Sequence, residues 1–282
     1  MTSVLRLSGI SAAASLCLAL VPVTDAQAQS TFVPCSSNRV ALLRAAINSA
    51  NAAGQGSIAL ASNCTYSLTD VDPSESQPSS PDGLPEITGD VTLSAAPGAT
   101  IERSMATGTP NFRIFTVEMG GKLSLNNITV RNGKLVGAMG AGISNHGTLN
   151  VRVGGIRNNE TNSVGGGLEN VAGATATLDM TTVSGNKSTA DAGGGIANSG
   201  TLRANYTMLS GNTAQLQGGG LVNLAGQATF AFGSVTGNTS NSGLGGGIYE
   251  QPGSMVTAYF TSFSGNMPNN CRPMGAVPGC AN

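Results

Sequence analysis

A glycine run followed by one apolar residue recurs five times between residues 140 and 248. The last glycine of each run lies at position 142, 167, 195, 220 or 247, so the steps are 25, 28, 25 and 27 residues. A second signature, an apolar residue followed by Ser/Thr-Gly-Asn, falls between these runs. Self-similarity at a spacing of about 20–50 residues is typical of a solenoid in which each repeat forms one coil.

Each repeat also contains a segment in which apolar and polar residues alternate. The apolar positions are Leu149, Val151 and Val153; Leu178 and Met180; Leu202, Ala204 and Tyr206; Phe230 and Phe232; and Val256, Ala258 and Phe260. Alternation with period two indicates a strand with one buried face, so we expect all of these side chains to point into the core. Two further apolar positions per repeat, such as Ile196 and Leu209, predict three short strands per coil. The predicted fold class is all-β: a right-handed parallel β-helix of about eight coils of about 26 residues.

Two sets of asparagines recur at the corners of the predicted coils. The first set is Asn145, Asn170, Asn198 and Asn223, and the second is Asn186, Asn212, Asn238 and Asn266. Equivalent asparagines stacked coil upon coil can form ladders in which each amide donates to the next. Glu250 takes the fifth place of the first set, and a carboxylate cannot donate. We therefore expect the first ladder to end at that coil.

The two ends of the chain depart from the repeat. Residues 29–56 are interpreted as an N-terminal cap, with a helix over 39–51 that starts after the capping residues Ser36-Ser37-Asn38. Val40, Leu43, Ile47 and Ala50 fall on one face of that helix, which predicts that it covers the first coil. The β-helix then spans 57–266. Residues 267–282, which contain three prolines, are expected to form a C-terminal cap or tail.

The first 28 residues are typical of a secretory signal peptide. Arg6 precedes an apolar stretch from Ile10 to Val23, and Ala26-Gln27-Ala28 offers the small residues of a cleavage site. A membrane anchor is the alternative, but 14 residues are too few to cross about 30 Å of hydrocarbon as a helix. We expect cleavage near Ala28, secretion to the periplasm or the cell exterior, and no membrane insertion.

Four cysteines remain after that cleavage: Cys35, Cys64, Cys271 and Cys280. An even number of cysteines in an exported chain indicates disulfides. Four cysteines allow three pairings, and closeness in the sequence favours Cys35–Cys64 and Cys271–Cys280. Zinc binding is the weaker alternative, because the chain has no Cys-x-x-Cys pair and His146 is its single histidine.

Residues 70–86 form the one compositional break, with five acidic residues, four prolines and no basic residue. Two interpretations stay open. The segment is a solvated insertion from one coil, which we favour, or it is an acidic site for a divalent cation that supports metal-dependent adhesion. The spacing matches no ordered calcium loop, so we assign no metal ligand.

Composition and charge bound the function. The net charge is −1 and charged residues make up 10% of the chain, so a nucleic-acid partner is not expected. The acids of the regular repeats lie singly at different corners: Glu160, Glu169, Asp179, Asp191 and Glu250. His146 has no acid beside it and is interpreted as an exposed turn residue. We assign no catalytic residue and no cofactor.

A family resemblance rests on several segments of the chain. Cys35-Ser36-Ser37 leading to residues 43–48, together with residues 56–60, 64–69 and 87–93, resembles the opening of bacterial exported right-handed parallel β-helix proteins of the pectin-lyase-like fold. The Gly-Gly-Gly-Ile runs and Phe263-Ser264-Gly265-Asn266 resemble the repeats of polymorphic outer-membrane proteins. The resemblance covers roughly residues 32–266. It is specific for the fold and implies no single activity.

These observations predict an exported, non-catalytic β-helix that acts as a structural or surface-interaction protein. The expected partner is a glycan or another cell-surface component, and the oligomeric state stays open. Because pectin-lyase-like β-helices include polysaccharide lyases and hydrolases, the resemblance implies such an enzyme as the alternative function.

Overall fold

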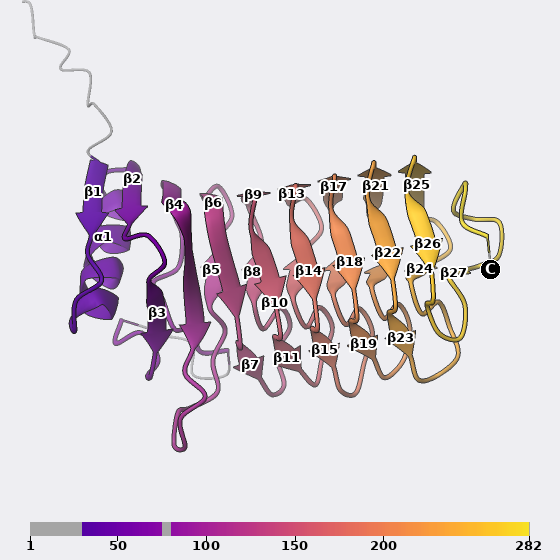
Figure 1. Cartoon of the computed structure of the whole chain (residues 1–282), viewed down its shortest axis with the longest axis horizontal. Helices are drawn as coiled ribbons and strands as arrows, with labels where there is room; N and C mark the ends of the chain where they lie inside the picture. The colour runs from indigo at the N-terminus through magenta and orange to yellow at the C-terminus, as the bar shows by residue number, and fades with distance from the viewer. Residues whose placement is uncertain (1–29, 75–79, 282) are drawn as a thin grey trace, which may run out of the picture.

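The computed structural model describes residues 30–74 and 80–281, which form a parallel β-helix of about nine turns (Figure 1). The predicted signal peptide, residues 1–28, and Glu75 of the acidic segment lie outside the described residues. Within the described part, no helix has the length and apolar character needed to span a membrane.

A regular coil contains four strands rather than the predicted three. In the coil that starts at Leu168 these are β12 (Leu168–Asn170), β13 (Thr175–Asp179), β14 (Thr182–Ser184) and β15 (Lys187–Ser188). Each strand pairs in parallel with its counterpart one coil away. The additional two-residue strand directly follows ladder residue Asn186, whose amide holds the backbone in register with the next coil.

The strands stack into three sheets along the axis. The 15-stranded sheet contains β1 (Ser30–Val33), β2 (Gln55–Leu60), β3 (Thr65–Leu68), β4 (Asp90–Arg103), β6 (Lys122–Arg131), β9 (Thr148–Arg152), β10 (Gly155–Arg157), β13, β14, β17 (Thr201–Asn205), β18 (Met208–Ser210), β21 (Gln227–Ala231), β22 (Ser234–Thr236), β25 (Met255–Tyr259) and β26 (Ser262–Ser264). The seven-stranded sheet contains β5 (Phe115–Val117), β8 (Ile143–Asn145), β12, β16 (Ile196–Asn198), β20 (Leu221–Asn223), β24 (Ile248–Glu250) and β27 (Cys271–Arg272). The five-stranded sheet contains β7 (Lys134–Leu135), β11 (Glu160–Thr161), β15, β19 (Thr213–Ala214) and β23 (Thr239–Ser240).

Both ends of the core are covered. Helix α1 (Arg39–Ala52) buries Leu43, Ala46, Ile47 and Ala50 against the first coils (Figure 1). At the other end, Cys271 and Val277 join the hydrophobic core. The predicted disulfides Cys35–Cys64 and Cys271–Cys280 are both formed, which is typical of an oxidising compartment such as the periplasm or the cell exterior.

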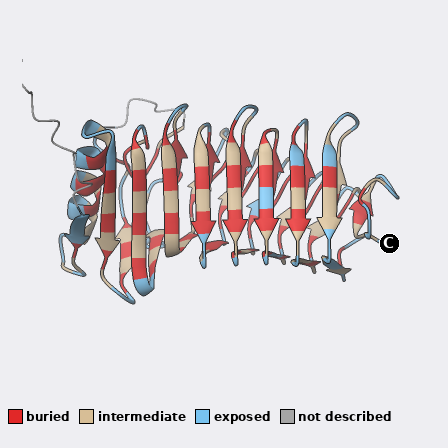
Figure 2. Ribbon diagram, turned by 90° about the horizontal axis from the view of Figure 1, so that it is seen from above, coloured by how far each residue is buried: buried red, intermediate tan, exposed pale blue. Residues whose placement is uncertain are grey.

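The predicted alternation holds along the strands and fails at their ends. Buried and more exposed residues alternate along the strands in Figure 2, and pairs such as Leu149 and Val151 lie in the core. The last apolar residue of each segment was expected inside and is exposed instead: Val153, Met180, Tyr206, Phe232 and Phe260. All five have a positive φ, between 47° and 55°, at the corner after the strand. The left-handed backbone there breaks the period-two pattern, so these side chains face solvent.

The asparagines of each set are hydrogen-bonded in series. In the first set, the Nδ2 of Asn145, Asn170 and Asn198 donates to the Oδ1 of the next asparagine at 2.7–2.8 Å. The second series is longer than the sequence indicated, because it starts at Asn159 and continues past Asn266 to Asn270. In that series, most backbone N–H groups also donate to the next Oδ1.

The first ladder ends one coil earlier than predicted. Asn223 donates to the carbonyl oxygens of Gly226 and Met255 rather than to Glu250. The Glu250 carboxylate instead accepts from the backbone N–H of Val256.

The acidic segment is not the solvated insertion that we favoured. Asp72 and Asp82 are buried, and Leu84 is fully buried in the core. Arg44 of α1 pairs with both Asp70 and Asp72, and Arg113 pairs with Asp82. Because burying a charge requires a partner, Asp72 and Asp82 are matched by arginines from outside the segment.

Candidate functional site

The outer face of the seven-stranded sheet changes from polar to apolar along the axis. Six of its strands, from β5 to β24, each place one residue on this face, and the aligned series reads Thr116, Ser144, Glu169, Ala197, Val222 and Tyr249. The seventh strand, β27, then aligns Arg272 with Tyr249. Loops cover the sheet here, so even the three polar members are buried. Ala197 and Val222 form a small apolar cluster with Ala192.

A cleft with a volume of about 690 Å³ opens over the polar half of this face. Thr116, Ser144 and Glu169 form its floor. The remaining lining residues are Ser80, Glu86, Arg113, Glu118, Gly137, Ala138, Met139, His146, Ser163 and Val171. The cleft therefore lies between the acidic segment and the loop that precedes β8.

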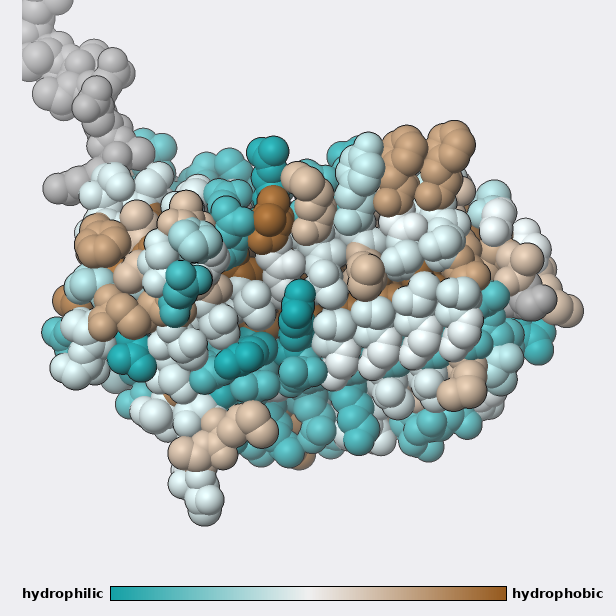
Figure 3. Space-filling view, viewed as in Figure 1, coloured by the Kyte–Doolittle hydropathy of each residue, from teal (hydrophilic) through white to brown (hydrophobic). Residues whose placement is uncertain are grey.

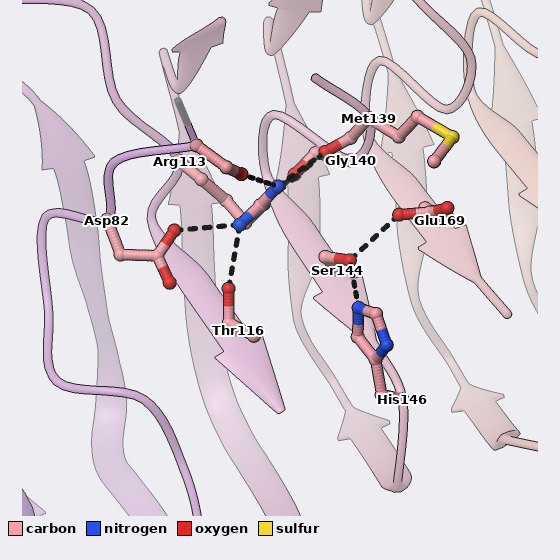
Figure 4. Close-up of polar contacts among 9 residues, drawn as sticks. Asp82, Arg113, Thr116, Met139, Gly140, Ser144, His146 and Glu169 are labelled. Carbon is pink, nitrogen blue, oxygen red and sulfur yellow. Dashed lines mark hydrogen bonds and ion pairs between the residues drawn. The ribbon is translucent and has the colours of Figure 1, made fainter. Parts of the chain in front are cut away.

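The side chain of Arg113 holds these two walls together (Figure 4). Its Nη1 lies 2.9 Å from Asp82 Oδ1 and 2.8 Å from Thr116 Oγ1. Its Nη2 donates to Ser80 Oγ and to the Met139 carbonyl, and its Nε donates to the carbonyl of Gly140. Because each nitrogen of the guanidinium already donates within the protein, Arg113 has a structural role in this cleft.

Ser144 connects His146 to Glu169 at the floor of the cleft (Figure 4). The Ser144 Oγ lies 3.0 Å from His146 Nε2 and 2.8 Å from Glu169 Oε2. Strand β8 carries Ser144, β12 carries Glu169, and His146 follows β8. His146 is exposed at the turn after β8, as predicted, and it contacts none of the described acids directly. Glu169 is nevertheless not isolated, because Ser144 connects it to the imidazole.

The direction of the hydrogen bonds among His146, Ser144 and Glu169 determines whether Ser144 can act as a nucleophile. Ser144 has one hydroxyl proton, and it donates that proton to the Glu169 carboxylate. His146 Nε2 must then donate to the serine oxygen, so it cannot act as the base that activates the serine. A nucleophilic triad requires the imidazole in the middle, between the acid and the serine. The arrangement fits a binding site better than a nucleophile.

Glu169 has a free hydrogen-bonding oxygen in the cleft. Its side chain is buried, with 8% relative exposure. Oε2 accepts from Ser144, and Oε1 has no hydrogen-bond partner among the described residues. In Figure 4 the two carboxylate oxygens point in different directions, with Oε2 toward Ser144. Oε1 is therefore accessible from the cleft and can accept a hydrogen bond from a ligand there.

The charges around the cleft are mostly acidic. Glu86, Glu118 and Glu169 line it together with His146. Arg113 is the cation of the lining, and Asp82 neutralises it. Within residues 30–74 and 80–281, no group of three or more histidine, cysteine, aspartate or glutamate side chains is arranged to hold a metal ion.

The cysteines and ladder asparagines that the sequence singled out do not form this cleft, whereas His146 and Glu169, to which no role was assigned, do line it. The four cysteines tie down the two ends, and the asparagine ladders lie buried at the corners. The contact between Ser144 and Glu169 was missed, although the two residues occupy the same place after the glycine-apolar signature in successive repeats. That equivalence places them side by side in neighbouring coils.

Comparison with known proteins adds little to this description. No family model matches the sequence, and no curated protein matches it. Among solved structures, the A-module of the Azotobacter vinelandii mannuronan C-5 epimerase AlgE4 aligns over 89% of this chain and 97% of its own. The aligned residues are 13% identical and the TM-score is 0.22, so this similarity carries no argument about function.

Proposed function

We propose that this protein is an exported β-helix that binds a glycan outside the cytoplasm, and that the polar cleft is its binding site. The single observation that carries the proposal is Glu169, a buried carboxylate with one unpartnered oxygen at the floor of an open cleft. The two disulfides support an extracellular or periplasmic location.

The groups in the cleft match the chemistry of sugar hydroxyls. A sugar hydroxyl both donates and accepts hydrogen bonds, and the cleft offers a carboxylate, an imidazole and serine hydroxyls. Ligands of low polarity instead favour pockets lined mainly by apolar and aromatic side chains. The surplus of carboxylates repels anionic polymers such as polyuronates. We therefore expect a neutral or amino-sugar polymer in the cleft.

A polysaccharide lyase is a poor fit to this site. Such an enzyme needs a cation to neutralise the uronate carboxylate and a base to remove a proton. Arg113 is the cation of the cleft lining, and its nitrogens donate to Asp82, Thr116, Ser80 and backbone carbonyls.

A glycoside hydrolase is the second candidate function. Hydrolases of sugars use a pair of carboxyl groups on either side of the scissile bond. Glu86, Glu118 and Glu169 line the same cleft, which provides the residue types for such a pair.

Binding of purified protein to immobilised neutral, amino-sugar and uronate polymers tests the proposal. We expect binding to a neutral or amino-sugar polymer, weakened about tenfold or more in Glu169→Gln because a charged hydrogen bond is lost. Glu160→Gln is the matched control, since Glu160 pairs with Lys134 outside the cleft and should not matter. Equal binding of every tested polymer by wild type and Glu169→Gln would contradict the assignment of the cleft as a binding site.

The same polymers distinguish binding from catalysis. We expect no new reducing ends and no unsaturated product after prolonged incubation. Release of reducing ends by wild type, lost in Glu169→Gln and kept in Glu160→Gln, would establish the hydrolase instead.

A further inference from the structure

Five apolar side chains form an exposed row along one corner of the β-helix. In each coil this corner connects the strand equivalent to β13 with the strand equivalent to β14. We name this row the corner stripe; it consists of Val153, Met180, Tyr206, Phe232 and Phe260. Their relative exposures are 47%, 47%, 62%, 51% and 83%. In Figure 3 apolar side chains stand in a row along the upper edge of the molecule, above β21 and β25.

The backbone conformation does not account for these residue types. All five have a positive φ, which large side chains adopt at a conformational cost and which Gly or Asn adopts easily. In the coil before Val153, the same corner carries Asn127. The next left-handed corner along each coil uses only asparagine or glycine: Asn132, Asn158, Gly185, Gly211, Gly237 and Gly265. One left-handed corner thus has only the residue types that adopt positive φ easily, whereas the corner of the stripe has large apolar residues that do not. The residue types of the stripe therefore need a reason other than backbone conformation.

Ring stacking explains only part of the stripe. Tyr206 stacks on Phe232, and Phe232 stacks on Phe260, each with ring centroids 5.2 Å apart. These contacts stabilise the three rings. Val153 and Met180 are equally exposed and lie outside this stack. A continuous exposed apolar row on a soluble surface marks an interaction site.

A row of polar side chains runs beside the stripe. Arg152, Asp179 and Asn205 each come one residue before a stripe residue and are aligned in register. Asn205 Nδ2 donates to Asp179 Oδ1 at 2.9 Å. These three residues, with Met180, Tyr206 and Phe232, line a hollow of about 400 Å³. The polar row holds one cation, one anion and one amide, so its net charge is zero.

We propose that the corner stripe and its polar row bind an uncharged polysaccharide that lies along the long axis of the β-helix. The ligand must be apolar on one side, form hydrogen bonds on the other, and repeat along its length. Coils repeat at about 4.8 Å, so an extended polymer of sugar units meets an apolar and a polar group in the coils of Val153, Met180 and Tyr206. In the two coils beyond, Ala231 and Tyr259 take the place of the polar residue, and the polymer meets only Phe232 and Phe260 of the stripe. The zero net charge of the polar row selects an uncharged chain. This site shares the ligand class of the proposed function but uses none of the cleft residues.

Asparagine substitutions separate a binding role from a structural one. In Tyr206→Asn/Phe232→Asn the corner keeps a residue that tolerates positive φ, as Asn127 does one corner earlier. We expect the double variant to bind hydroxyethylcellulose, a soluble neutral glucan, at least tenfold more weakly than wild type in affinity electrophoresis. Met180→Asn, outside the ring stack, should also weaken binding, with a Tm no lower than that of wild type. Met119→Asn is the control for an exposed methionine elsewhere and should bind as wild type does.

The outcomes distinguish this site from the cleft and from other occupants. Glu169→Gln should retain binding at the stripe, so loss of binding in that variant alone places the glucan in the cleft and overturns the proposal. Unchanged binding in Met180→Asn and in the double variant overturns it as well. Sedimentation that shows a wild-type dimer, and a monomer in the double variant, assigns the stripe to a second copy of the chain instead. Stronger binding of polygalacturonate than of the neutral glucan contradicts the inferred ligand class.

Discussion

Asp82 and Arg113 are 31 positions apart in the sequence, yet Asp82 Oδ1 and Arg113 Nη1 lie 2.9 Å apart and both side chains are buried. The pair joins the acidic segment to the residues just before β5. The same guanidinium also donates to the carbonyls of Met139 and Gly140 on the opposite wall of the cleft. One side chain therefore sets the width of the candidate site.

Replacement of Arg113 by methionine should destabilise the protein strongly. Removing one partner of a buried ion pair leaves the other charge unpaired, which costs about 3–5 kcal/mol. Urea unfolding followed by circular dichroism measures the loss. Arg131→Met is the control, because the Arg131–Glu102 pair is partly exposed and should contribute under about 1 kcal/mol. A similar loss in both variants would contradict the role given to Arg113.

Replacement of Asn212 by alanine should break the second ladder in its middle. Asn212 Oδ1 accepts from the N–H and the Nδ2 of Asn186, while its own Nδ2 donates to Asn238 and to the Val183 carbonyl. Because these partners are buried, their unsatisfied groups should lower the free energy of unfolding by about 2–4 kcal/mol. Asn241→Ala, which removes an exposed side-chain bond to Gln215, should change it by less than about 0.5 kcal/mol. Equal effects would show that the ladder does not stabilise the coils.

Replacement of Glu250 by asparagine should extend the first ladder and alter the pH dependence of stability. Burial raises the pKa of the Glu250 carboxyl above its ordinary value of 4.5, although the hydrogen bond from Val256 N–H opposes this. The folded state then holds the proton more tightly than the unfolded chain does. The stability contributed by Glu250 is accordingly greatest at acid pH and is lost as the pH rises through the raised pKa.

Asparagine at position 250 has no charge to lose and can accept from Asn223. We expect a gain of about 0.5–1 kcal/mol at neutral pH, because a partly buried charge is removed and a ladder hydrogen bond replaces one of the two carbonyl contacts of Asn223 Nδ2. The advantage over wild type should grow between about pH 4 and pH 7. Glu250→Gln should flatten the pH dependence without the full gain, since its longer side chain does not match the ladder. Chemical unfolding at a series of pH values measures both effects, and an advantage independent of pH would contradict the assignment.

Replacement of Val153 by asparagine should stabilise the protein. Val153 is β-branched, exposed and held at φ 51°, whereas Asn127 occupies the same corner in the preceding coil. Removing an unfavourable left-handed valine should raise the free energy of unfolding by about 1 kcal/mol. Val151→Asn, two residues earlier in the core, should lower it by several kcal/mol. A lower Tm in Val153→Asn would show that the valine contributes packing that its exposure does not reveal.

The sequence readily predicted the solenoid, the asparagine ladders and the two disulfides. Amide ladders follow from asparagines at a constant spacing, and pairing of neighbouring cysteines follows from their places at the two ends. The solenoid itself follows from the glycine runs. In each case one local pattern suffices, because stacking brings equivalent positions of successive coils together.

The features that were missed depend on more than one position. Tyr206 and Met180 were expected inside, because alternation says nothing about where a strand ends and φ changes sign. Glu169 and His146 looked isolated because Ser144, two residues before His146, meets Glu169 only across two neighbouring coils. Asp82 looked solvated because its partner, Arg113, lies in a different element. Predicting these features requires knowing which residues of other coils or elements lie beside a given position, and where each strand ends, in addition to the repeat spacing.

The left-handed corner has a consequence for how such a surface can change. Its side chain is turned out of the core in every coil, so its identity is released from the packing constraints that fix Leu149 or Val151. Duplication or loss of a single coil would lengthen or shorten the exposed row by one member without disturbing the rest. The length of the contact surface can therefore change in steps of one repeat, and its chemistry can change by single substitutions at the corner position.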